Sequence, residues 1–172
     1  ILETQIKTSQ QKDLIIGVSL ETGLFTQTLV RSKGGTGDTS KAEATIKIRV
    51  TVGNRRAEPG EVTFDKRYQE LMAKFGGVLA CSDTDGDGIV SFDECVITEE
   101  ELNLILNTMA AHAFNFVIDD LGAGTHNVGV EAMGDTNASW QLGSASANAA
   151  VGKGSLTVEE VRLVKGVELL AP

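Results

Sequence analysis

The sequence predicts a mainly β protein, an antiparallel β-sandwich with a helical insertion, and three observations lead to this fold class. Residues 44–52 read "ATIKIRVTV", in which Ile46, Ile48, Val50 and Val52 alternate with polar residues. Strict alternation places the apolar side chains on one face of a strand and leaves the other face to water. Half-exposed strands of this kind are typical of antiparallel sheets. The second observation is a change of apolar period in the middle third, and the third is a return to alternation after Ala113.

Length and composition fit one soluble domain, which we place at 1–172. The chain has 172 residues, 15 Lys and Arg against 24 Asp and Glu, and a formal net charge of −9. No apolar run approaches the roughly 20 residues that a membrane-spanning helix needs. The acidic balance repels phosphate backbones and anionic lipid surfaces, so we expect no nucleic-acid partner and no membrane span. Cations are the partners that this charge favours.

The N-terminal part is expected to form strands joined by polar turns. Residues 13–30 predict two strands with a turn at Glu21–Gly23, and the Gly-rich stretch 31–41 predicts an exposed loop. That loop is not a phosphate cradle, because Lys41 is followed by Ala42 rather than by Ser or Thr. Residues 61–64, "EVTF", predict a further short strand.

The helical insertion is predicted over 65–112. Leu71, Met72, Phe75 and Leu79 fall at helical spacing, although Gly76 and Gly77 weaken this helix. In 99–112, Thr98 and Glu101 match a capping box, and the helical face would be Leu102, Ile105, Leu106, Met109 and Ala113. The competing interpretation is a strand built on the alternation of Leu102, Leu104 and Leu106, which leaves Ile105 facing water. The helix is favoured because it uses the cap, and the alternative stays open.

Alternation resumes in the last third. Phe114, Phe116 and Ile118 predict one strand, Val128 and Val130 predict the next, and the glycines of 122–126 predict a hairpin turn between them. "VGKG" at 151–154 predicts a turn, and 155–166 predicts a final strand with a bulge at Glu159–Glu160. The expected sandwich is jelly-roll-like or Ig-like.

Residues 83–94, "DTDGDGIVSFDE", carry the clearest chemical motif. Calcium takes six to eight oxygen ligands, which a loop supplies from its first, third and fifth side chains, with glycine sixth for the sharp bend. Asp83, Asp85, Asp87 and Gly88 occupy those places. The predicted ligand set is completed by the carbonyl of Ile89, by Ser91 directly or through water, and by a bidentate Glu94. The sequence therefore predicts a Ca²⁺ site made of Asp83, Asp85, Asp87, Ile89, Ser91 and Glu94.

This loop resembles the EF-hand calcium loop of the calmodulin family, and the resemblance covers Asp83–Glu94 only. Sensor EF-hands work in pairs and expose a methionine-rich groove. This chain has one such loop and three methionines, which favours a structural ion. Dockerin modules are similar to it to a lesser extent, because they carry two tandem calcium repeats.

Cys81 and Cys95 are the only cysteines and bracket this loop. An even pair is what an exported protein would bridge, so we expect a disulfide and an extracellular or cell-surface location. The chain begins at Ile1 without a basic and apolar leader, as expected of a mature chain whose signal peptide has been removed. A disulfide across the loop would oppose any opening.

No other motif predicts catalysis. His112 and His126 lack a nucleophile motif around them and are expected to be ordinary hydrogen-bonded histidines, and Asn137 begins a glycosylation sequon. Trp140 and Tyr68 are the only Trp and Tyr, so a sugar-stacking surface is disfavoured. We expect a non-enzymatic, calcium-binding structural protein for adhesion or assembly, with calcium, its own copies or a cell-surface protein or glycan as partners. The alternative is a secreted carbohydrate- or protein-binding accessory module; a calcium-dependent enzyme or sensor is less favoured.

Overall fold

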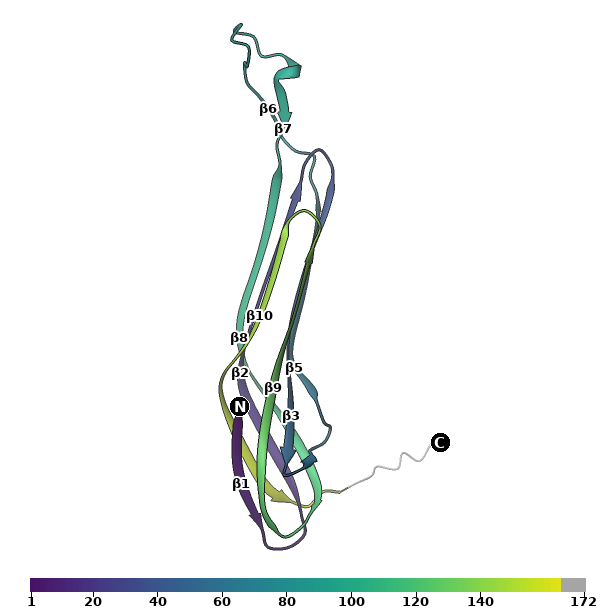
Figure 1. Ribbon diagram of the computed structural model, residues 1–172, viewed down its shortest axis with the longest axis vertical. Coiled ribbons are helices and arrows are strands. Elements are labelled where there is room, and N and C mark those ends of the chain that lie inside the picture. Colours follow the sequence, from purple (N-terminus) through teal and green to yellow (C-terminus); the bar gives the residue numbers. More distant parts are fainter. Residues whose placement is uncertain (165–172) are drawn as a thin grey trace, which may run out of the picture.

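The computed structural model describes residues 1–164 as a long, narrow body of β strands with a small projection at one end (Figure 1). Long strands build the body, and the projection, which we call the tip (residues 78–97), carries a short hairpin. The elements are β1 (Leu2–Thr8), β2 (Lys12–Ser32), β3 (Gly37–Val52), β4 (Arg55–Arg56), β5 (Val62–Lys74), β6 (Leu79–Cys81), a 3₁₀ turn η1 (Phe92–Glu94), β7 (Cys95–Ile97), β8 (Glu100–Leu121), β9 (Gly124–Trp140) and β10 (Ser144–Val161).

All strand pairs are antiparallel and form two body sheets. One sheet has the order β1-β9-β3-β4, with β5 also pairing with β3, and the other has the order β10-β2-β8. β6 and β7 pair only with each other. The predicted class, mainly β with antiparallel sheets, is confirmed.

The two body sheets pack on one apolar core. Ile46, Ile48, Val50 and Val52 of β3 are at most 1% exposed, which confirms the strand predicted from their alternation. From the facing sheet, Leu14, Ile16 and Val18 of β2 and Phe116 of β8 meet them, and Val128 and Val130 of β9 complete the centre. Each of these residues is every second one in its strand, as a sheet with one buried face requires.

Towards the tip, the interior becomes polar. Thr26 and Thr28 of β2 are fully buried and hydrogen bond to the amide of Gln69 from β5 in the other sheet. Asp38 is 1% exposed, and its carboxylate accepts backbone N–H groups of Arg31, Thr39 and Leu142. Burial raises the pKa of Asp38, but these donors and that of Gly143 outweigh it, so the pKa lies below its usual range. The buried polar groups here are therefore paired.

The predicted helical insertion over 65–112 is wrong. Residues up to Lys74 belong to strand β5, and those from Glu100 belong to β8, so the strand interpretation of 99–112 is the correct one. The helical spacing predicted the wrong structure because β8 is exposed on both faces between Glu101 and Ala111. Since neither face is buried there, the sequence does not need to alternate apolar and polar residues. Thr98 and Glu101 form no capping box: the Thr98 hydroxyl donates to the Val78 carbonyl, and Glu101 pairs with Arg31.

Two predicted turns near the N-terminus also differ. Glu21–Gly23 lies inside β2, which runs unbroken from Lys12 to Ser32 because it pairs with β8 and β10 on both sides. The loop predicted at 31–41 shortens to residues 33–36, and Asp38 and Ser40 are buried. Residues 61–64 do contribute a strand, as the start of β5.

The C-terminal predictions are partly correct. The strands around Phe116 and Val128 exist, but β8 and β9 belong to different sheets, so the glycine turn joins two sheets and not two paired strands. The predicted turn at 151–154 is a register shift inside β10, and pairing continues regularly through Glu159 and Glu160, where a bulge was expected. The last residues of that predicted strand, 165–166, lie outside the described residues.

Candidate metal site

The tip is a hairpin closed by a disulfide. Cys81 of β6 lies opposite Cys95 of β7 in the strand register, and their sulfurs are bonded, which confirms the predicted bridge. No residue of the tip is buried; Glu94 and Cys95 are half-buried and the others are exposed. Packing therefore contributes little here, and the bridge and local hydrogen bonds hold the loop in shape.

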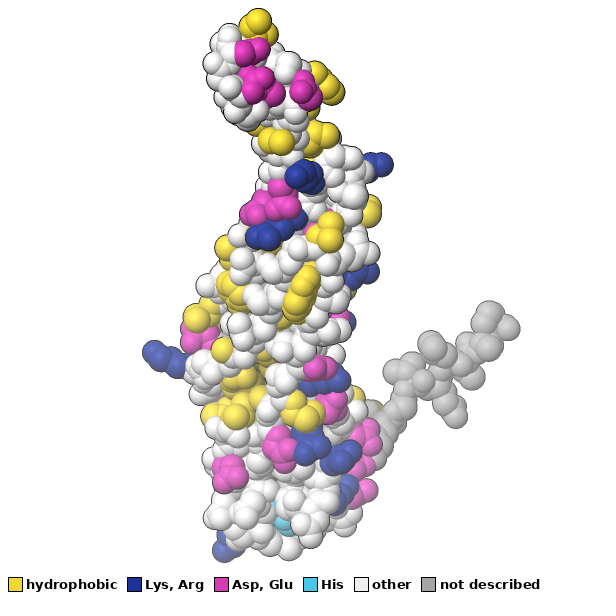
Figure 2. All heavy atoms as spheres, turned by 45° about the horizontal axis from the view of Figure 1, so that its top comes forward, with side chains coloured by type: hydrophobic (Ala, Val, Ile, Leu, Met, Phe, Trp, Pro, Cys, Tyr) yellow, Lys and Arg dark blue, Asp and Glu magenta, His cyan; other side chains and the backbone are white. Residues whose placement is uncertain are grey.

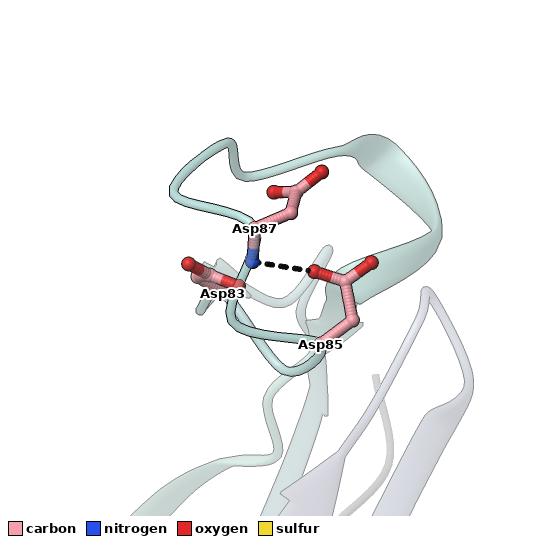
Figure 3. A group of neighbouring side chains, drawn as sticks. All are labelled: Asp83, Asp85 and Asp87. Carbon is pink, nitrogen blue, oxygen red and sulfur yellow. Dashed lines mark hydrogen bonds between the residues drawn. The ribbon is translucent and has the colours of Figure 1, made fainter.

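Three aspartates of the predicted ligand set come together at the end of the tip (Figure 3). One carboxylate oxygen from each of Asp83, Asp85 and Asp87 lies within 4.8 Å of the others. Two oxygens bound to one calcium ion at about 2.3–2.6 Å can be no more than about 5 Å apart. The separation of these oxygens therefore fits a shared calcium ion.

Backbone conformation brings the aspartates together. Gly86 and Gly88 have φ values of 79° and 84°, which other residues rarely adopt. The two oxygens of Asp83 accept the N–H groups of these glycines at 2.6 and 2.8 Å. These bonds, that of Gly88 first, lower the pKa of Asp83, so the carboxylate is charged at neutral pH.

The carboxylate of Glu94 is not among the three clustered carboxylates, although its Oε1 accepts the backbone N–H of Asp85 at 3.2 Å. Its Oε2 accepts the N–H of Ser91 at 2.9 Å, and its Oε1 accepts the N–H and the hydroxyl of Thr84 at 2.6 and 2.8 Å. These donors, with Ser91 first, lower the pKa of Glu94 to about 2. The predicted bidentate role requires Glu94 to turn from these donors toward the ion. The hydroxyl of Ser91 donates to Asp93 at 2.6 Å and to Glu94 at 3.3 Å. Ile89, whose carbonyl is the predicted ligand, donates its N–H to Asp87 Oδ1 at 2.7 Å.

Strands, not helices, flank this loop. β6 enters it and β7 leaves it, and the 3₁₀ turn Phe92–Glu94 is the single helical element of residues 1–164. The helix pair whose opening defines a calcium sensor has no counterpart in this part of the chain. The likeness to the EF-hand is therefore confined to the spacing of the loop residues.

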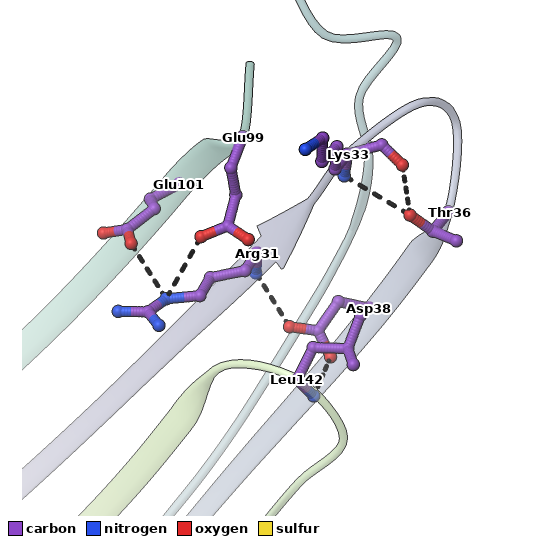
Figure 4. A network of polar contacts seen from close by, with 7 residues as sticks. All are labelled: Arg31, Lys33, Thr36, Asp38, Glu99, Glu101 and Leu142. Carbon is purple, nitrogen blue, oxygen red and sulfur yellow. Dashed lines mark hydrogen bonds and ion pairs between the residues drawn. The ribbon is translucent and has the colours of Figure 1, made fainter. Parts of the chain in front are cut away.

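A narrow neck connects the tip to the body. The N–H of Thr98 donates to the Val78 carbonyl at 2.9 Å, and the N–H of Gly77 donates to Glu100 at 3.0 Å. Just below, Arg31 pairs with Glu101 at 2.8 Å and lies 3.9 Å from Glu99, while its backbone N–H donates to Asp38 (Figure 4). This network fixes the starting point of the tip.

The surface of the tip is acidic and apolar. Asp83, Asp85, Asp87, Asp93 and Glu94 lie on it, and the sequence has no Lys or Arg between Lys74 and Lys153. Apolar side chains lie among the carboxylates (Figure 2): Phe92 is 81% exposed and Ile89 69%. This apolar surface was not predicted from the sequence, although Ile89, Val90 and Phe92 next to a glycine-rich loop indicate it.

The other candidate residues lie far from this site. His126 hydrogen bonds to the Gly122 carbonyl at 2.8 Å, and His112 lies 3.5 Å from Asp65 without a good hydrogen bond. The expectation of an ordinary hydrogen-bonded histidine therefore holds for His126 and is wrong for Nε2 of His112. Asn137 is exposed in β9.

Trp140 and Tyr68 are both about half exposed, yet they cannot form one sugar platform. Trp140 lies opposite Ser40 in the register, and Tyr68 lies opposite Glu43. Residues 40 and 43 are an odd number of positions apart in β3, so their side chains point to opposite faces of the sheet. The two aromatic rings are therefore on opposite faces.

Searches with the chain find no matching family model, no similar curated protein and no similar solved structure. Among residues 1–164, no helix is long and apolar enough to cross a membrane.

Proposed function

We propose that this chain is a calcium-binding structural protein of the cell surface or extracellular space, in which the ion stabilises the tip for adhesion or assembly. One observation carries the proposal: oxygens of Asp83, Asp85 and Asp87 lie within 4.8 Å of one another in a loop whose glycines hold them there. The chemistry of this donor set is that of a hard cation, since all the side-chain ligands are oxygens.

The surroundings of the loop support a structural rather than a sensing role. The disulfide joins the segments that enter and leave it, and neither is a helix that could swing open. Bound calcium would offset the repulsion among the carboxylates of the tip, which has no core of its own. The ion would thus act with the disulfide to order the loop.

The position and surface of the tip support adhesion or assembly as its purpose. It projects from the end of the long body (Figure 1), and it exposes Ile89 and Phe92 beside the aspartates. Exposed apolar side chains grouped at such a place are typical of a protein contact surface. The disulfide agrees with an oxidising, extracellular location. We propose no catalytic activity for this site.

Calorimetric titration with CaCl₂ tests the metal site. We expect one ion per chain in the wild type and a loss of affinity of at least about tenfold in Glu94→Gln, because calcium loops use this residue as a bidentate ligand. Asp93→Asn is the matched control: Asp93 lies outside the ligand pattern, and an Asn Oδ1 can still accept the Ser91 hydroxyl that Asp93 accepts at 2.6 Å. This variant should retain wild-type affinity within a few fold. If the wild type binds no ion up to 10 mM CaCl₂, about tenfold above the weakest dissociation constants of extracellular calcium modules, the calcium site is refuted.

Hydrogen exchange distinguishes a local structural role from a global one. Because the tip shares no core with the body, calcium should slow amide exchange in residues 83–94 and leave β2, β3 and β9 unchanged. Equal exchange in the tip with calcium and with chelator would contradict the structural role even if the ion binds.

A further inference from the structure

The edge strand β8 has an unusual combination of length, exposure and neutrality. It lies at one edge of the sheet β10-β2-β8, and all its residues from Glu101 to Ala111 are exposed. Residues 102–118 contain no Asp, Glu, Lys or Arg. Natural proteins protect exposed edge strands with charges, prolines or bulges, because an unprotected edge pairs with another strand. β8 has none of these between Leu102 and Ala111.

The unpaired backbone groups of this edge can be assigned from one contact. Lower on β8, the N–H and C=O of Val117 both bond to Glu58, at 3.0 and 2.8 Å, so these groups point away from β2. Backbone direction alternates along an antiparallel strand, and the pairing of β8 with β2 is regular from Glu100 to Ile118. The groups of Asn103, Ile105, Asn107 and Met109 therefore point outward as well. Within residues 1–164 these outward backbone groups have no hydrogen-bond partner.

The sequence of this edge is suited to pairing with itself. Residues 103–107 read Asn-Leu-Ile-Leu-Asn, a palindrome centred on Ile105. If two copies pair antiparallel about a two-fold axis at Ile105, then Ile105 faces Ile105, Leu104 faces Leu106, and Asn103 faces Asn107. Apolar side chains then meet apolar ones, and amides meet amides, which are favourable cross-strand pairs.

The distribution of charge also favours a second copy of the chain as the partner of this edge. The net charge of −9 makes two copies repel each other over most of the surface. In the pairing centred on Ile105, Glu100 faces Ala110 and Glu101 faces Met109, so no carboxylate lies opposite another. A neutral edge does not attract a charged partner. Two identical chains, which repel each other because both are acidic, repel least when they meet at this edge.

We propose that the chain forms a two-fold dimer through antiparallel pairing of β8 with β8 of a second copy, centred on Ile105. The two three-stranded sheets join into one continuous sheet, β10-β2-β8-β8-β2-β10. The exposed side chains of Leu104, Ile105 and Leu106, which are 39%, 53% and 40% exposed in the single chain, are covered in this contact. The dimer does not require calcium, so either the dimer or the metal site can be refuted without affecting the other.

Sedimentation equilibrium of the full chain at 1–200 μM, in chelator, tests the dimer. We expect dimers in the wild type and a dissociation constant raised by at least about tenfold in Ile105→Lys, which places two like charges at the axis. Met133→Lys is the control: Met133 is 39% exposed on β9, in the sheet that does not contain β8, and its variant should dimerise as the wild type does. A wild type that is monomeric at 200 μM overturns the proposal and leaves the edge to a different partner. Equal dimerisation of wild type and Ile105→Lys overturns it as well.

Cysteine cross-linking tests the register. Residues of a hydrogen-bonded antiparallel pair have Cα atoms about 5.5 Å apart, within the range that a disulfide spans. Ile105→Cys should form a covalent dimer under mild oxidation on a non-reducing gel, because the residue faces its own copy. Met109→Cys, on the same face of β8 and 73% exposed, faces Glu101 and should stay largely monomeric. Equal cross-linking of both variants would contradict the pairing centred on Ile105.

Discussion

The body and the tip of this molecule are held together by different forces. The body buries aliphatic side chains from both sheets, among them Leu14, Ile48 and Phe116, each 0% exposed. The tip buries no residue and relies on the Cys81–Cys95 bridge and on hydrogen bonds within its loop. The hydrophobic effect scales with the apolar area removed from water, so it can stabilise the body and hardly acts on the tip.

The apolar core and the exposed acidic loop are therefore separated along the long axis of the molecule. A loop without a core can keep its carboxylates and its apolar side chains exposed, because nothing in it must be buried. It then needs a covalent bond, and we propose a bound ion, to limit its conformations. Changes in one region should therefore leave the other nearly unaffected.

The largest effect is expected from the core. Phe116→Ala should lower the free energy of unfolding by about 3–5 kcal/mol, because it removes a fully buried ring and leaves a cavity. Urea denaturation followed by circular dichroism measures this change. Phe92→Ala is the matched control at the tip: Phe92 is 81% exposed, and its loss should change the stability of the body by less than about 0.5 kcal/mol. Similar losses in both variants would contradict the separation.

The next effect concerns the disulfide. The bridge joins residues 14 positions apart, and a loop of that size loses about 3 kcal/mol of stabilisation when its cross-link is removed. In the double variant Cys81→Ser and Cys95→Ser, proteolysis within 82–94 should become faster and the calcium affinity weaker. The urea midpoint of the body should not change. A lowered midpoint would show that the tip and the body unfold together.

A smaller effect is expected at the neck. Gly77 has a φ of 81°, and a Cβ there would lie 2.3 Å from Ile97 Cγ2 and 2.9 Å from the Thr98 carbonyl. Gly77→Ala should therefore destabilise the junction by about 1–3 kcal/mol, measured as faster amide exchange at Thr98. Gly76→Ala is the control next to it, because a Cβ at Gly76 meets no atom within 4 Å. If the Thr98 amide exchanges at the same rate in both variants, the close packing at Gly77 does not stabilise the junction between the tip and the body.

The smallest effect is a pH dependence confined to the tip. The pKa of Glu94 is about 2 in the folded loop, below its ordinary value of 4.5. A lowered pKa stabilises the folded loop above pH 4.5, and this contribution is lost as the pH falls towards 2. A nuclear magnetic resonance titration of the calcium-free protein should show Glu94 titrating near pH 2, with shifts at the Thr84 and Ser91 amides. Titration of Glu94 near 4.5 would contradict these hydrogen bonds.

Local sequence determined the parts of this protein whose causes are local. The alternation at Ile46–Val52 predicted a buried strand face, since one sheet face must avoid water. The spacing of Asp83, Asp85, Asp87 and Gly88 predicted the carboxylate cluster, and the only two cysteines predicted their bridge. Each of these inferences depends on residues within one short segment.

The conformation of the middle of the chain depends on tertiary contacts. The sequence of residues 98–112 matches a helical spacing and a capping-box pattern, but pairing with β2 makes 100–112 part of a strand, and Thr98 bonds to Val78 instead. The same long-range pairing carries β2 straight through Glu21–Gly23, where local composition predicted a turn. Backbone hydrogen bonds to distant strands outweigh local preferences of a few tenths of a kcal/mol per residue, roughly the range of the propensity scales. Which strands become neighbours, and that β8 is left as an exposed edge, cannot be read from any single segment.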